Sequence, residues 1–174
     1  MEAKINVAAI LKDKPENTKL YSPLYGDVYF SYIGVRNNIC VLHHRFTLSD
    51  FFYNGRYTAY KESEIMLFPS KEMRDWSKFA WKKGDVLVSE DNVHIIFEKF
   101  EDDTYTRFKG KHYLWKECNV EDYNKEETKM LTSVFEKATD DVAQTYIKTI
   151  EEHLDGKLNL ETLEIEKQLE FKDG

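Results

Sequence analysis

The segment FPSKEMRDWSKFAWKKGD, residues 68–85, separates two stretches of β-like sequence and decides how the rest of the chain is interpreted. Within it, Met73, Trp76 and Phe79 recur at the spacing of one helical face. We predict a short amphipathic helix over residues 70–80 that acts as a strut, with these three side chains packed between two β modules. The alternative is that Trp76 stands in solvent as an anchor for a partner, because tryptophan is enriched at the centres of protein interfaces.

The stretch upstream of this helix is aromatic and divided into short segments. An amphipathic helix is expected within residues 2–14, and residues 18–69 predict about five short strands joined by tight turns. The Asn54-Gly55 pair is a strong hairpin signal because both residue types tolerate a positive φ. Closing a small sheet removes its exposed edges, so we expect residues 1–69 to form a helix plus a small β-barrel-like module. Its pattern is similar to that of Src-homology and Tudor barrels.

The stretch downstream of the helix alternates apolar and polar residues. Residues 81–118 predict a four-stranded meander, with strands at residues 86–88, 93–97, around Tyr105 and at 113–115. Paired acidic residues, Glu90-Asp91 and Asp102-Asp103, supply the turns between them.

The period changes again in residues 119–174. Apolar spacing predicts one helix over residues 130–135 and a second over residues 142–154, with Thr139 as the N-cap of the second. A short β pair follows within residues 158–167. The predicted fold class is therefore α+β, with two β modules joined by the short helix and an acidic helical pair at the end.

Charge is distributed unevenly along the 174 residues, whose formal net charge is −7. Residues 1–80 hold 11 basic against 9 acidic side chains, residues 81–118 hold 7 against 8, and residues 119–174 hold 7 against 15. The acidic last third would repel nucleic acid and attract a basic partner, whereas the first half is nearly neutral.

No sequence feature points to a membrane or to the secretory pathway. No run approaches the roughly 18 apolar residues of a membrane span, and the first residues do not follow the signal-peptide pattern. We therefore expect a cytoplasmic protein. Cys40 and Cys118 are far apart in the sequence, and we expect a reduced, structural thiol at each.

The motifs of the common enzyme and cofactor classes are absent from the sequence. Neither glycine-rich phosphate-binding pattern occurs, nor does a nucleophile elbow or a zinc-protease motif. Cys40 and His43 have a C-x-x-H spacing, but residues three apart on a strand face opposite sides and cannot chelate one ion. We therefore predict a non-enzymatic protein with no metal and no cofactor.

Aromatic residues give the main functional signal. Residues 21–60 contain eleven Phe or Tyr residues with arginines among them, a combination that binds single strands or peptides by stacking and cation–π contact. The competing interpretation is that a small barrel needs large side chains to fill its core. Candidate binding residues are those expected to lie outside, around the hairpin tip and on neighbouring strands: Tyr53, Arg56, Tyr57, Tyr60, Arg36 and Arg45.

The sequences ILKDKPENTKLYSPLYGDV (residues 10–28) and LFPSKEMRDWSKFAWKKGDVLV (residues 67–88) also carry a resemblance. They are similar to a group of uncharacterised proteins of gut Bacteroidales, including Bacteroides, and of their mobile elements and bacteriophages. The similarity spans roughly residues 7–90 and is most specific at residues 67–79. It continues loosely at LNLETLEIEK, where Leu158 replaces the aromatic residue that is usual in the group. The group has no established activity, so the resemblance implies only a bacterial or phage accessory gene.

Two functional hypotheses follow. The first is an interaction protein that binds a basic protein partner, with its aromatic barrel surface as the anchor and its acidic last third as the electrostatic complement. The alternative is recognition of single-stranded nucleic acid or a nucleotide by the aromatic face. Catalysis requires a deep pocket with converging polar groups.

Overall fold

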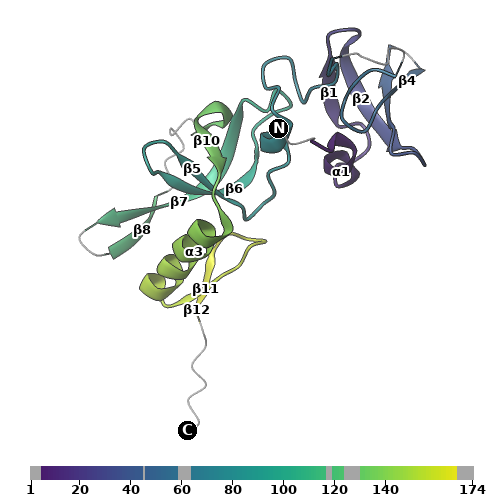
Figure 1. Cartoon of the computed structure of the whole chain (residues 1–174). Coiled ribbons are helices and arrows are strands. Elements are labelled where there is room, and N and C mark those ends of the chain that lie inside the picture. Colours follow the sequence, from purple (N-terminus) through teal and green to yellow (C-terminus); the bar gives the residue numbers. More distant parts are fainter. Residues whose placement is uncertain (1–4, 45, 59–63, 117–118, 124–129, 168–174) are drawn as a thin grey trace. The chain divides into compact units, whose positions relative to one another are not determined.

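The computed structural model divides the chain into two compact units (Figure 1). The first unit comprises Met1–Ala80 together with Asp102–Thr106, and the second comprises Trp81–Glu101 together with Arg107–Gly174. The four-part division predicted at residues 69/70, 80/81 and 118/119 stays a prediction. The structure describes residues 5–44, 46–58, 64–116, 119–123 and 130–167.

The first unit is built on an antiparallel sheet with the strand order β1-β2-β3-β4. Its strands follow one another through tight turns and are β1 (Lys19–Ser22), β2 (Gly26–Ile33), β3 (Ile39–His43) and β4 (Thr47–Phe51). The predicted N-terminal helix is confirmed as α1 (Val7–Lys12). The Asn6 side chain accepts a hydrogen bond of 3.0 Å from the Ala9 N–H, which caps this helix, and α1 buries its apolar face.

Isolated bridges continue the strand pairing beyond both edges of this sheet. At the end of β4, Phe51 pairs with Tyr57 across the predicted Asn54-Gly55 turn, and Gly55 has a φ of +85°. At the other edge, Tyr21 of β1 and Phe68 exchange backbone hydrogen bonds of 2.9 and 2.8 Å. The described strands form an open sheet, so the predicted closed barrel is not confirmed.

The segment at residues 68–85 contains a shorter helix than predicted, α2 (Trp76–Phe79). Its N-cap is Asp75, whose carboxylate accepts hydrogen bonds from the N–H groups of Ser77 and Lys78. The Ser70 hydroxyl accepts a hydrogen bond from the Met73 N–H in the preceding turn and does not cap this helix. The helix begins later because the Asp75 side chain satisfies the first free N–H groups at that point.

The three predicted strut residues are all buried within the first unit. Trp76 is only 3% exposed, and its Nε1–H donates to the Leu67 carbonyl at 2.9 Å. Phe79 contacts the Trp76 ring edge-on and also contacts the ring of Tyr105. Met73, which precedes the helix, is buried as well. Trp76 is therefore not a solvent-exposed anchor. That these side chains join two β modules stays a prediction.

The second unit is built on a larger antiparallel sheet with the order β10-β5-β6-β7-β8, in which β9 also pairs with β7. A helix, α3 (Asp140–Leu154), and a two-stranded sheet of β11 (Gly156–Leu158) and β12 (Ile165–Lys167) complete the unit. The strands of the larger sheet are β5 (Val86–Ser89), β6 (His94–Phe100), β7 (Arg107–Lys116), β8 (Asn119–Tyr123), β9 (Met130–Leu131) and β10 (Phe135–Lys137).

Both faces of this sheet bury apolar side chains. On one face, Tyr146 and Ile150 of α3 pack with Val86 and Ile96 of the sheet and with Leu163 before β12. On the other face lies a mainly aromatic cluster whose buried members are Trp81, Leu87, Ile95, Phe97, Phe108 and Phe135. Because alternate residues of β5 enter opposite clusters, strand alternation accounts for the two cores.

Two elements predicted for the chain after α2 are wrong. Residues 130–135 were expected to form a helix, but they form β9, the 3₁₀ helix η1 (Thr132–Val134) and the start of β10. Pairing with the sheet overrides the helical spacing, because Phe135 lies opposite Ser89 of β5 and fills the aromatic cluster. Tyr105 was expected in a strand but lies in a turn with φ of +57°, and it belongs to the first unit.

The other predictions for the C-terminal region are confirmed. Thr139 is the N-cap of α3, since its hydroxyl accepts a hydrogen bond from the Val142 N–H at 3.4 Å. The predicted terminal β pair is formed by β11 and β12. The fold class is α+β with mainly antiparallel sheets. Among the described residues, no helix has the length and apolar character needed to cross a membrane.

Candidate functional site

The candidate residues predicted from the aromatic signal lie in the first unit, at different depths. Arg36 is exposed in the turn between β2 and β3, and Tyr53 and Arg56 are exposed in the turn after β4. The pairing of Ile39 with Phe51 places these two turns at the same end of the sheet. Arg45 and Tyr60 lie outside the described residues.

Tyr57, the remaining candidate, is half-buried and takes part in a polar cluster inside the first unit. Its hydroxyl lies 2.5 Å from the Tyr25 hydroxyl, and the Tyr25 ring stacks on the His43 imidazole with the ring centres 3.9 Å apart. His43 Nε2 is 2.6 Å from the Ser49 hydroxyl. In the sequence, His43 is notable only for its C-x-x-H spacing from Cys40, and nothing in the local pattern predicts its contact with Tyr25.

His43 is held in its neutral form. Its side chain is only 7% exposed, and burial, followed by repulsion from neighbouring His44, lowers its pKa below the usual value of histidine. Its second nitrogen, Nδ1, is buried and has no hydrogen-bond partner among the described residues. A serine–histidine pair needs a group at this nitrogen to orient the ring for nucleophilic catalysis. The geometry of His43 and Ser49 therefore does not form a catalytic triad.

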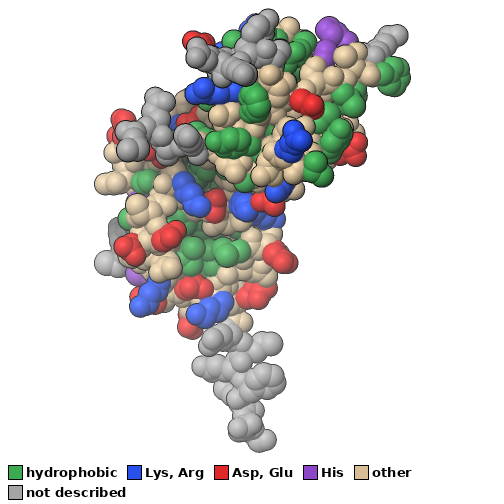
Figure 2. Space-filling view, turned by 45° about the vertical axis from the view of Figure 1, so that its right-hand side comes forward, with side chains coloured by type: hydrophobic (Ala, Val, Ile, Leu, Met, Phe, Trp, Pro, Cys, Tyr) green, Lys and Arg blue, Asp and Glu red, His purple; other side chains and the backbone are tan. Residues whose placement is uncertain are grey.

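The outer face of the first sheet carries apolar side chains in cross-strand rows. Tyr29, Leu42 and Leu48 are successive neighbours across β2, β3 and β4, and Tyr32 lies opposite Cys40 in the next row. Tyr32 is 53% exposed, and Phe46, in the turn between β3 and β4, is 91% exposed. Hydrophobic side chains are visible between charged ones on the molecular surface in Figure 2.

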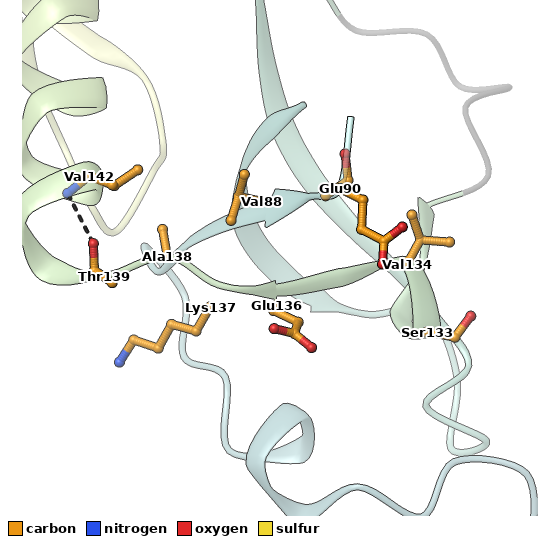
Figure 3. A pocket seen from close by; sticks show the side chains of 10 residues that line it. Val88, Glu90, Ser133, Val134, Glu136, Lys137, Ala138, Thr139 and Val142 are labelled. Atoms are coloured by element: carbon orange, nitrogen blue, oxygen red, sulfur yellow. Dashed lines mark hydrogen bonds between the residues drawn. The ribbon is translucent and has the colours of Figure 1, made fainter. Parts of the chain in front are cut away.

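The second unit contains a pocket of about 360 Å³ beside β10 (Figure 3). The end of β5, the 3₁₀ helix η1, β10 and the first turn of α3 line this pocket. Val88, Val134 and Val142 supply apolar surface, and Val134 and Val142 are 48% and 41% exposed. Glu90 and Glu136 lie at its rim and are exposed. We call these five residues the acidic groove.

Lys137 also lines this pocket, but its place on β10 differs from that of Glu136. Glu136 lies opposite Val88, on the face of the sheet that α3 packs against, whereas Lys137 lies opposite Leu87, on the aromatic face. The ammonium group of Lys137 forms an ion pair of 3.9 Å with Asp85. The α3 side of the groove is therefore acidic, and Asp140 and Asp141 in the first turn of α3 add to its negative charge.

A second concave surface continues along α3 from Val142, which lines both pockets. It has a volume of about 380 Å³ and includes Asp141 and His94. The His94 ring stacks on Tyr146, whose hydroxyl donates to the His94 carbonyl at 3.2 Å. Burial and repulsion from His94 lower the pKa of His112. His94 and Tyr146 of this surface are thus engaged with each other.

The described part of the chain contains no group of three or more His, Cys, Asp or Glu side chains arranged to hold a metal ion. Cys40 is buried, and burial raises the pKa of its thiol, which favours an inert rather than a nucleophilic sulfur. Cys118 lies outside the described residues. The sequence does not predict the acidic groove, because the helix expected over residues 130–135 takes the place of β9, η1 and the start of β10.

Comparisons of the chain with protein-family models, with curated proteins and with solved structures find no match. The candidate site therefore depends on the geometry of the groove and of the first sheet alone.

Proposed function

We propose that the protein is a non-enzymatic interaction protein that binds a basic segment of a partner protein in the acidic groove. The observation that carries this proposal is the composition of the groove, in which the apolar surface of Val88, Val134 and Val142 is edged by the carboxylates of Glu90 and Glu136. An arginine or lysine side chain matches both parts, because its methylene stem packs on apolar surface while its charged end stays hydrated beside the carboxylates.

The charge of the surrounding sequence supports a basic partner. Residues 119–174 hold 7 basic against 15 acidic side chains, and Asp140, Asp141, Glu151 and Glu152 all belong to α3. A surface of one sign steers an oppositely charged partner during encounter and disfavours partners of the same sign. We keep, as part of the proposal, a cytoplasmic accessory protein of a bacterium or phage, supported by the resemblance at residues 67–79.

Peptide binding tests the proposal. A fluorescently labelled peptide of about seven residues, with a central arginine between valine and threonine residues, is titrated with the full chain at low salt. The same peptide with a central glutamate serves as the matched ligand. We expect the arginine peptide to bind at least about tenfold more tightly, a difference of about 1.4 kcal/mol.

A pair of charge-reversal variants locates the binding site. Glu90→Lys with Glu136→Lys is expected to weaken binding of the arginine peptide by about tenfold or more. The control, Glu161→Lys with Glu164→Lys, changes the net charge equally at exposed positions outside the groove. Equal losses in the two variants, or no binding of the arginine peptide by the unmodified chain, would contradict the proposal.

The alternative function, binding of single-stranded nucleic acid, is favoured by one specific observation. Five aromatic side chains of the first unit are exposed and could stack on bases: Tyr29, Tyr32, Phe46, Phe52 and Tyr53. An oligo(dT) of about 12 nucleotides tests this function. Binding that weakens steeply between about 50 and about 200 mM salt, as counterion release requires, would support it. Absence of binding at low salt would exclude it for this probe.

A further inference from the structure

The second sheet has an edge at β10, beside the acidic groove. β10 pairs with β5 on one side and stands first in the strand order of the sheet. The unpaired edge of a sheet presents backbone N–H and C=O groups that can bind another extended chain. Only the backbone groups of β10 that face away from β5 can form hydrogen bonds with an added chain.

The register of β10 identifies these groups. The Ala138 N–H donates to the Val86 carbonyl at 2.9 Å, so Ala138 and Val86 form a hydrogen-bonded pair. Such pairs alternate along an antiparallel ladder, so Glu136 also directs its backbone groups toward β5. Phe135 and Lys137 therefore direct theirs outward.

Three outward groups of this edge are open to a partner. The Phe135 N–H donates to the Thr132 carbonyl of η1 and is satisfied. The Phe135 carbonyl and both backbone groups of Lys137 have no hydrogen-bond partner among the described residues. An added chain could thus make at most three backbone hydrogen bonds to β10, which is too few for tight binding without side-chain contacts.

The acidic groove supplies those side-chain contacts. Glu136 lies between the two outward-facing residues, and its side chain projects to the same face of the sheet as Val88. A residue of an added strand beside Glu136 would project to this face as well, next to Glu136 and two strands away from Val88, a distance that the long side chain of arginine or lysine can span. Figure 3 shows the Glu136 carboxylate on the side of β10 away from Val88, toward the unpaired edge.

We propose that an extended, basic segment of the partner adds to the sheet as a strand alongside Phe135–Lys137 and places an arginine or lysine in the acidic groove. The inference rests on the proposed function and specifies its binding mode. Charge complementarity selects the occupant, because Glu90 and Glu136 border the groove while the ammonium group of Lys137 is paired with Asp85. A second copy of β10 would bring Glu136 against Glu136, which like-charge repulsion disfavours.

Backbone methylation tests strand addition separately from charge recognition. Two versions of the arginine peptide carry N-methyl groups on alternate amides, one version on the odd positions and one on the even positions. An added strand directs only one of these two sets toward β10. We expect one methylated peptide to lose about tenfold or more in affinity and the other to bind like the parent peptide.

The outcomes separate the binding mode from the function. If both methylated peptides bind like the parent, strand addition is overturned while charge-dependent binding in the groove stands. If the parent itself does not bind, both proposals are overturned. On the protein side, hydrogen exchange of the Lys137 amide should slow at least about tenfold at saturating peptide. Unchanged exchange at Lys137 with bound peptide would also overturn strand addition.

Discussion

The two sheets of the protein differ in how much of their surface is covered. In the second unit, α3 packs on one face and an aromatic cluster lies on the other, while the edge strand β10 and the acidic groove stay exposed. In the first unit, one face buries Val28, Phe30 and Val41, while the opposite face leaves Tyr29 and Tyr32 in solvent. The two units therefore offer a partner different chemistry. The second unit offers backbone groups and charged side chains, and the first unit offers aromatic rings.

This difference shows that exposed aromatic area does not by itself identify the site. The first unit has more exposed rings, but Tyr29, Tyr32 and Phe46 carry no charge that would define an occupant. The groove of the second unit combines apolar surface, carboxylates and open backbone groups, with Val88 and Glu90 from the end of β5 and the rest from the short stretch Val134–Val142. Binding specificity depends on such combinations, because apolar surface, negative charge and open backbone groups each exclude a different set of partners.

Replacement of the buried indole should have the largest effect and would test the contrast between buried and exposed rings within the first unit. Trp76→Ala removes a side chain that is 3% exposed and leaves the Leu67 carbonyl without its donor. We expect a loss of about 3–5 kcal/mol in the free energy of unfolding. Urea denaturation, monitored for the first unit by the amide signals of β2 and β3, measures it. A loss below about 1 kcal/mol would contradict the observed burial.

Acidification should destabilise the first unit through His43. Burial lowers the pKa of His43 in the folded chain, whereas in the unfolded chain this histidine has the usual pKa of about 6.5. Below about pH 6.5 the unfolded chain therefore binds a proton at His43 more readily than the folded chain does. The contribution of His43 to the free energy of unfolding is complete above about pH 6.5, and it is lost as the pH falls from there toward the folded-state pKa. NMR titration of the imidazole should give a midpoint below about 6.5. A midpoint at or above that value would contradict the assignment, and His43→Gln should reduce the acid sensitivity.

Loss of a helix cap should give an intermediate effect that is confined to the second unit. Thr139→Ala removes the hydroxyl that accepts from the Val142 N–H at the start of α3. We expect a loss of about 1 kcal/mol, whereas Thr139→Ser, which keeps a hydroxyl, should stay close to the unmodified chain. Thermal or urea unfolding measures both variants. Equal destabilisation by alanine and serine would show that the cap hydrogen bond is not responsible.

The smallest expected effect is a gain in stability at an exposed ring of the first unit. Phe46 is 91% exposed and has a φ of +73°, a region that is unfavourable for a residue with a side chain. Phe46→Gly should raise the free energy of unfolding by about 0.5–1 kcal/mol, because the relieved strain exceeds the added entropy of the unfolded chain. Thr47→Gly, at a neighbouring exposed position in β4, is the control and should lower stability. If Phe46→Gly lowers the free energy of unfolding as much as Thr47→Gly does, the proposed backbone strain at Phe46 is contradicted.

Local signals in the sequence predicted the elements that are determined locally. The Asn54-Gly55 turn, the Thr139 cap and the apolar face of α1 depend on residues within a few positions of one another. The helix expected over residues 130–135 failed because Phe135 is fixed by pairing with β5, more than forty positions earlier. The acidic groove was not predicted for the same reason, since the position of its lining residues depends on the pairing of β10 with β5.

The polar cluster of the first unit was unpredictable for the same reason. His43 of β3 contacts Tyr25, from the turn before β2, and Ser49, from β4, so the cluster depends on the pairing of separate strands. The sequence indicated which residues could bind a partner through aromatic chemistry, but it could not indicate how deeply each would lie. Tyr57 is half-buried and bonded to Tyr25, whereas Tyr53 is exposed.

Amide chemical-shift mapping with the arginine peptide tests most directly whether the acidic groove is the binding site. The full chain is titrated with the peptide, and shifts are followed in both units at once. We predict that the largest changes occur at Val88, Glu90 and the stretch Val134–Val142. Changes concentrated at Tyr29, Tyr32 and Leu48 on the outer face of the first sheet, with none around the groove, would contradict this account.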